Sequence, residues 1–187
     1  MRIVAGRHKG RVLQAPQGLH TRPTADRVRE SLFNIIAHGS PRLEGQRVLD
    51  AFAGSGALGF EALSRGAGHV TFMETDGSAM AIIYANAKKL GVLDQVAVQR
   101  LDATKPPKAP TPCRFVLMDP PYKSGLAKAA LAALQAQGWL TPDALVVVEV
   151  AAGEPFTSPI PGLAIADERT YGAARLVFLR FSNPLPS

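Results

Sequence analysis

The chain has 187 residues, of which 47% are hydrophobic, and a formal net charge of +6. This length and composition exclude wholesale disorder and predict one well-cored domain. No apolar run is long enough to span a membrane and the N-terminus has no apolar signal segment, so we expect a cytoplasmic protein without membrane contact. A single cysteine, Cys113, excludes a disulfide framework, and the four histidines share no ligand spacing, so no metal site is expected.

The positive charge is concentrated at one end of the chain. Residues 1–47 contain nine of the 21 Lys and Arg residues but only three of the 15 acidic residues, and the two kinds balance over the remainder. The basic segment is patterned and rich in glycine and apolar residues. We therefore interpret it as a phosphate-binding surface rather than a solvated tail.

The first part of the chain predicts a small hairpin followed by a helix. Residues 2–5 and 11–14 are short β-type runs joined by a basic, glycine-flanked turn over 6–10. A helix follows residues 21–23, with Thr24 as its N-cap and an apolar stripe that includes Val28 and Leu32. We therefore divide the chain into a basic β-hairpin appendage over residues 1–20, which carries part of this phosphate-binding surface, and a main domain over residues 21–187.

From residue 46 onward, apolar strands alternate with helices. The predicted strands cover residues 47–52, 69–74, 96–100, 114–118 and 144–150, and the helices residues 57–65, 76–90 and 125–137. Such alternation is typical of a mostly parallel sheet covered by helices on both faces. Residues 163–167 and 174–181 are expected to pair as an antiparallel hairpin. The sequence thus predicts an α/β fold with a seven-stranded, mostly parallel sheet.

A glycine-rich loop joins the strand over 47–52 to the helix over 57–65. Residues 54–59, Gly-Ser-Gly-Ala-Leu-Gly, match the G-x-G-x-x-G pattern of dinucleotide-binding folds. Asp50 argues against a dinucleotide, because a carboxylate at the end of the strand would repel a pyrophosphate. It would attract a cation, and S-adenosylmethionine carries a sulfonium, an ammonium and no phosphate. We therefore predict S-adenosylmethionine as the cofactor, with S-adenosylhomocysteine as its product.

Acidic residues at successive strand ends complete the predicted cofactor site. Asp50 is expected near the methionine amine, Glu74 at the ribose hydroxyls and Asp102 at the adenine amine. Residues beside these carboxylates or in the glycine loop are included in the site: Ala51, Phe52, Gly54, Gly56, Thr75 and Ala103. Because ligands of doubly wound sheets bind outside the carboxyl ends of the strands, these carboxylates are expected to line one crevice.

The strand over 114–118 leads into a second motif, Asp119-Pro120-Pro121-Tyr122. The two prolines fix the backbone and remove two N–H donors, which leaves carbonyl oxygens and one carboxylate beside an aromatic ring. Such a group suits the exocyclic amine of a nucleobase. Asp119 and the Pro120 carbonyl can each accept an amine hydrogen bond, while Tyr122 stacks on the base. We predict that the four motif residues form the catalytic site.

These motifs together resemble one protein family. The segments over residues 22–35, 50–67 and 117–122 are similar to the RsmD family, bacterial enzymes that use S-adenosylmethionine to methylate a guanine N2 in 16S ribosomal RNA. The resemblance implies a Rossmann-like class I methyltransferase, with Thr24 beside the cofactor. It also implies that 16S rRNA, or an assembling small ribosomal subunit, is the partner of a monomeric protein. Residues predicted to bind RNA lie in the basic segment: Arg2, Arg7, His8, Lys9, Arg11, Arg22 and Arg27.

Other functions fit the motifs less well. A DNA adenine-N6 methyltransferase would use the same catalytic motif, but it normally needs an additional target-recognition region. A protein glutamine methyltransferase usually has Asn in place of Asp119. The intact motif disfavours a catalytically idle RNA-binding assembly protein, and Asp50 disfavours an NAD-dependent oxidoreductase.

Overall fold

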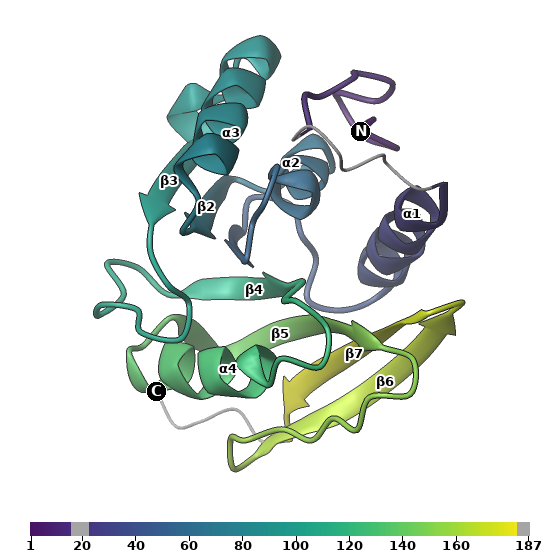
Figure 1. Ribbon diagram of the computed structural model, residues 1–187, viewed down its shortest axis with the longest axis vertical. Coiled ribbons are helices and arrows are strands. Elements are labelled where there is room, and N and C mark those ends of the chain that lie inside the picture. Colours follow the sequence, from purple (N-terminus) through teal and green to yellow (C-terminus); the bar gives the residue numbers. More distant parts are fainter. Residues whose placement is uncertain (16–22, 183–187) are drawn as a thin grey trace.

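The computed structural model describes residues 1–15 and 23–182, which form one twisted sheet with helices on both faces (Figure 1). The helices are α1 (Pro23–His38), α2 (Ala57–Ser64), α3 (Gly77–Leu90) and α4 (Leu126–Ala136), with a short 3₁₀ turn η1 (Leu93–Gln95). The strands are β1 (Arg47–Ala51), β2 (His69–Glu74), β3 (Val96–Arg100), β4 (Cys113–Met118), β5 (Leu140–Ala151), β6 (Leu163–Tyr171) and β7 (Ala174–Phe181). In the described part of the chain, no helix is long and apolar enough to cross a membrane.

The sheet has seven strands in the order β3-β2-β1-β4-β5-β7-β6. The first five strands in this order pair in parallel, whereas β7 pairs antiparallel with both β5 and β6. The predicted fold class is therefore confirmed. The carboxyl ends of β3, β2, β1, β4 and β5 lie next to one another at one edge of the sheet.

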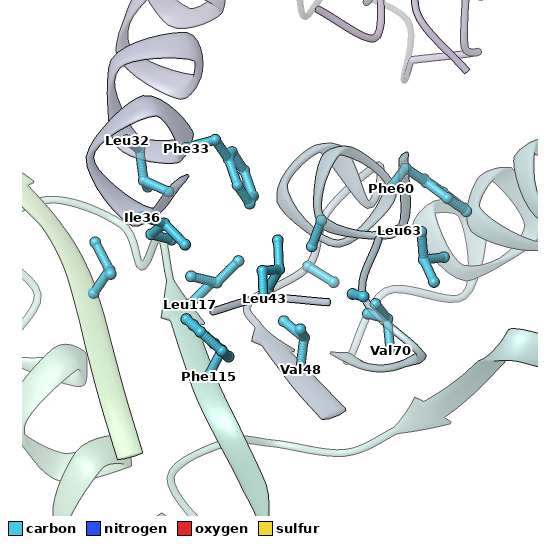
Figure 2. Packing of buried hydrophobic residues seen from close by; sticks show 14 of the residues in the cluster. Leu32, Phe33, Ile36, Leu43, Val48, Phe60, Leu63, Val70, Phe115 and Leu117 are labelled. Carbon is cyan, nitrogen blue, oxygen red and sulfur yellow. The ribbon is translucent and has the colours of Figure 1, made fainter. Parts of the chain in front are cut away.

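Alternate residues of the central strands face two separate hydrophobic layers. Val48 and Leu117 face α1, α2 and α3, and Figure 2 shows them packed near Leu43 and the α1 residues. Leu49 and Met118 face α4 and the loops beside it. Because side chains alternate along a strand, the two layers follow from consecutive apolar residues in β1 and β4.

The N-terminal segment packs on the helices instead of extending the sheet. It forms one antiparallel bridge, between Arg2 and Val12, where two strands had been predicted. Backbone hydrogen bonds cross the hairpin beside this bridge, from Ile3 to Arg11 and from Leu13 to Met1, but the next N–H groups along the chain bind a helix side chain, which ends the pairing. The buried Glu61 of α2 accepts hydrogen bonds from the N–H groups of Val4 (2.9 Å) and Ala5 (3.1 Å). Ile3 and Leu13 are buried in the same layer as α1 and α2, and Figure 1 shows this segment beside α2.

Two local expectations differ from the structure. Phe52 was predicted as the last residue of a strand, but its backbone has φ 67° and β1 ends at Ala51. The apolar spacing of α3 predicts Met80 on its buried face, but Met80 is only half-buried; Asn86 is fully buried instead, because its amide pairs with the backbone of Gln14. Arg22 and the side chain of Thr24 lie outside the described part of the chain.

Candidate active site

A cleft of about 790 Å³ opens at the carboxyl ends of the parallel strands. Nine predicted site residues line this cleft: Phe52, Glu74, Thr75, Asp102, Ala103, Asp119, Pro120, Pro121 and Tyr122. The remaining lining residues, which the sequence did not single out, are Met73, Leu101, Leu126 and Glu149. The structure thus brings together the ends of four strands and the motif that follows β4.

Glu74 organises the loops on the side of the cleft formed by β1 and β2. Its Oε2 accepts a 2.7 Å hydrogen bond from the N–H of Gly54, in the glycine loop. Its Oε1 accepts from the N–H groups of Thr75 (2.7 Å) and Asp76 (2.8 Å). One carboxylate therefore connects the end of β2 to the glycine loop.

The glycine loop has a backbone that ordinary residues rarely adopt. Gly54 and Gly56 have φ values of 54° and 80°, and Phe52, without that freedom, has φ 67°. A Cβ on Gly59 would lie 2.2 Å from the Phe72 ring, so this glycine lets α2 pack directly on β2. A strained Phe52 at the cleft wall is typical of a functional site.

Asp50 lies beneath the glycine loop and does not line the cleft. Its side chain points to the same face of the sheet as Val48, toward α2, and is 1% exposed. Oδ2 accepts a 2.8 Å hydrogen bond from the N–H of Gly59, in the first turn of α2. The N-cap of this helix, Gly56, offers no side-chain acceptor, so Asp50 caps the helix from the neighbouring strand. Burial raises the pKa of Asp50 well above its usual range.

Asp102 lies where the chain leaves β3. Its Oδ1 accepts hydrogen bonds from the N–H (2.8 Å) and the hydroxyl (2.7 Å) of Thr104. These bonds lower the pKa of Asp102 and keep it ionised. The exposed carboxylate gives this end of the cleft a fixed acceptor.

Asp119 and Tyr122 form the opposite wall of the cleft. Asp119 is exposed to the cleft, and partial desolvation by the surrounding walls, together with the nearby Glu149 carboxylate, raises its pKa to about 7. Tyr122 is 45% exposed, and its hydroxyl donates a 2.6 Å hydrogen bond to Glu149 Oε1. Burial and this bond raise the pKa of Tyr122.

The polar groups of the cleft suit a cationic ligand. Glu74, Asp102, Asp119 and Glu149 are acidic, and no Lys or Arg is among the lining residues in the described ranges. A pyrophosphate would meet these carboxylates and be repelled, whereas a sulfonium or ammonium would be attracted. The volume is also in the range of small-molecule sites. The residues present therefore fit S-adenosylmethionine.

The basic residues predicted to bind RNA lie outside the cleft. Arg2, Lys9 and Arg27 line a groove of about 290 Å³ between the N-terminal segment and α1. Arg7 at the tip of this segment hydrogen bonds to Gln95, and its N–H donates to the carbonyl of Ser64, the last residue of α2. The tip therefore lies at the end of α2 remote from the glycine loop.

The other end of the segment lies close to that loop. Ser55 Oγ is 3.7 Å from the sulfur of Met1. Of the remaining predicted RNA-binding residues, Arg11 is exposed and His8 is half-buried; burial lowers the pKa of His8.

Sequence comparisons identify the family. The family model described as "Conserved hypothetical protein 95" matches residues 1–180. The Ribosomal RNA small subunit methyltransferase D of Haemophilus influenzae is 38% identical over 176 residues, covering 92% of this chain and 89% of the relative. The protein of the same name from Escherichia coli K12 is 39% identical over 149 residues, covering 80% and 74%. The chain belongs to the RsmD family.

Structural comparisons agree with this membership. The Escherichia coli protein yhhF superposes with a TM-score of 0.85 at 36% identity, covering 98% of this chain and 99% of that one. A SAM-dependent methyltransferase from Aquifex aeolicus, at 17% identity and a TM-score of 0.60, shares the fold, with 82% and 89% covered. The RsmD resemblance and the Rossmann-like methyltransferase fold predicted from the sequence are thus both confirmed.

Proposed function

We propose that this RsmD-family protein transfers a methyl group from S-adenosylmethionine to the exocyclic N2 of a guanine in 16S ribosomal RNA. The observation that carries the proposal is the placement of Asp119, Pro120 and Tyr122 in the same acidic cleft as Glu74 and Asp102. Relatives named small subunit ribosomal RNA methyltransferases support an RNA substrate. The partner is 16S rRNA or an assembling small subunit, met in the cytoplasm by a monomer.

The cofactor would be held by the glycine-loop side of the cleft. Glu74 and Asp102 offer carboxylate acceptors for hydroxyl and amine groups, and Gly54 and Gly56 allow close approach of the backbone. Asp50 supports this loop from below through its hydrogen bond to Gly59. When bound, S-adenosylmethionine supplies a methyl group on a positively charged sulfur, which a weak nucleophile can attack.

The opposite wall would orient the base. The lone pair of an exocyclic guanine amine is delocalised into the ring, so the amine needs both positioning and charge stabilisation. Asp119 and the Pro120 carbonyl accept hydrogen bonds from its two N–H groups, while the Tyr122 ring stacks on the base. Asp119 must be ionised to accept well, so activity should rise as pH increases through about 7.

Transfer of a labelled methyl group to small-subunit RNA, free and in assembling particles, tests the proposal. Asp119→Ala should bind S-adenosylmethionine normally but lose turnover by about two to four orders of magnitude, as expected for a positioned acceptor. Asp119→Asn should retain only partial activity, since its amide oxygen can still accept a hydrogen bond from the amine but cannot take up its proton. An Asp119→Ala variant that methylates at the wild-type rate would remove this residue from the mechanism. Transfer to duplex DNA instead of RNA would support the DNA methyltransferase alternative, and cofactor binding without transfer would favour an idle RNA-binding protein.

A further inference from the structure

Glu149 is the one charged residue in the apolar stretch of β5 from Ala144 to Ala151. The neighbouring residues of β5 from Leu145 to Val150 are buried, whereas Glu149 is half-buried and lines the cleft. A carboxylate in such a position is unfavourable unless polar partners compensate for the lost water. Its position therefore calls for a specific role.

The sheet register brings Glu149 beside Asp119. Met118 of β4 pairs in parallel with Val148 of β5. Asp119 and Glu149 are the next residues after this pair, one on each strand. Leu117 and Val147, two residues earlier, face the same hydrophobic layer, so Asp119 and Glu149 leave the sheet on one face. Two adjacent carboxylates thus stand where the substrate amine is proposed to bind.

Glu149 also fixes the orientation of Tyr122. The 2.6 Å hydrogen bond from the tyrosine hydroxyl to Oε1 has the short length of a charge-assisted bond. The backbone on either side is restrained: two prolines precede the tyrosine, and the N–H of Lys123, at φ 57°, donates to Glu154 Oε2 at 2.9 Å. In the described part of the chain, Glu149 is the hydrogen-bond partner of this hydroxyl, which holds a 45% exposed ring in place.

We infer that Glu149 is a positioning residue for methyl transfer, which holds the Tyr122 ring against the target base and places a second negative charge beside Asp119. The inference rests on the proposed function. The amine nitrogen must lose one N–H proton, whose bonding electrons stay on nitrogen, and an Asp119 oxygen receives it. A neighbouring negative charge makes that oxygen a better proton acceptor.

A double-mutant cycle tests the link between Glu149 and Tyr122. Tyr122→Phe keeps the ring and removes the hydroxyl, and Glu149→Ala removes its acceptor. We expect Glu149→Ala to lower kcat/KM for RNA by about ten- to a hundredfold, the effect of losing a hydrogen bond to a charged group. The double variant should be no slower than Glu149→Ala, and cofactor affinity should be unchanged. If the loss of kcat/KM in the double variant equals the product of the losses in the two single variants, the residues act independently and the inference is overturned. Glu44→Ala, at an exposed glutamate just before β1, is the matched control.

The pH profile tests the effect of charge. Asp119 is faced by Asp50 from β1, Glu149 from β5 and Tyr122 from its own loop, with Glu154 near that tyrosine. Glu149→Gln keeps the shape but removes the like charge, so the pKa of Asp119 should fall. The acidic limb of kcat/KM, expected at about pH 7 in the wild type, should then move to lower pH. The pKa of Asp119 should stay above the usual carboxylate range, because desolvation by the cleft walls remains. An unmoved limb would contradict the inference.

A third measurement separates this inference from the proposed function. Carbon-13 labelling of tyrosine Cζ gives one signal for each of the three tyrosines, and Tyr122→Phe assigns the relevant one. Glu149→Ala should shift that signal, while Glu44→Ala should not. If the wild type methylates no RNA but the signal shifts, the proposed function fails while the Tyr122–Glu149 contact stands. If the wild type is active but the signal does not move, the inference fails alone.

Discussion

Replacing Asp50 by alanine tests whether this carboxylate acts on the cofactor or on the helix that follows the glycine loop. Asp50 is 1% exposed and accepts a 2.8 Å hydrogen bond from the N–H of Gly59. Removing it leaves that buried N–H without a partner, at a cost of about 1–3 kcal/mol. Loss of a negative charge at the helix N-terminus adds up to about 1 kcal/mol. The buried carboxylate is itself unfavourably desolvated, as its raised pKa shows. Removing it relieves this cost, which offsets the loss of the charge at the helix N-terminus. We therefore expect the free energy of unfolding to fall by about 1–3 kcal/mol.

Urea denaturation followed by the fluorescence of the buried Trp139 measures this change. Asp50→Asn keeps an oxygen acceptor and should lose less stability than Asp50→Ala. Calorimetric titration with S-adenosylmethionine should show affinity falling in the same order as stability, because the carboxylate acts through the glycine loop. The reasoning is refuted if Asp50→Ala unfolds like the wild type yet binds the cofactor about tenfold more weakly, or about 1.4 kcal/mol. That result would indicate direct contact with the methionine amine, as the sequence alone had suggested.

Three further changes test the cofactor site, the packing beneath it and the basic segment. Glu74→Ala should weaken calorimetric binding of S-adenosylmethionine by about 1–3 kcal/mol, and NAD should not bind; unchanged affinity would argue against this site. Gly59→Ala places a Cβ 2.2 Å from the Phe72 ring and should destabilise the protein by about 1–3 kcal/mol in urea, whereas Gly77→Ala, in open space, should not. Alanine at the three basic residues near the hairpin tip should raise the dissociation constant for RNA and flatten its salt dependence by at most about three phosphate contacts; wild-type binding across salt concentrations would place RNA recognition elsewhere. These residues are Arg7, Lys9 and Arg11.

Much of the sheet was predictable because local and tertiary preferences agree. The bounds of β2, β3 and β7 match the prediction, since short apolar runs end at polar residues there. The prediction for β5 was too short, because Thr141-Pro142-Asp143 has the composition of a turn, yet Leu140 pairs with Cys113. The strand β6 continues to Tyr171 through largely exposed residues, because backbone pairing with β7 determines it.

In the candidate site, the sequence alone could not predict the direction of the side chains at the strand ends. The sequence indicates which residue ends each strand, but not which face its side chain takes. Asp50 shares the face of Val48 and meets α2, so it caps a helix, whereas Glu74 reaches the glycine loop. Glu149 was missed as a functional residue because its apolar neighbours suggested only a buried strand. The feature of the sequence that could have indicated its role is that it is the one charged residue among these apolar neighbours, because burying a charge is unfavourable without a specific partner.

The chemical identity of the methylated nucleoside tests the central claim most directly. Small-subunit RNA is incubated with the protein and labelled S-adenosylmethionine, digested to nucleosides and separated by liquid chromatography with mass detection. Our account predicts labelled N2-methylguanosine from the wild type and only a trace from Asp119→Ala. Labelled N6-methyladenosine, a methylated pyrimidine, or equal product from both proteins would contradict it.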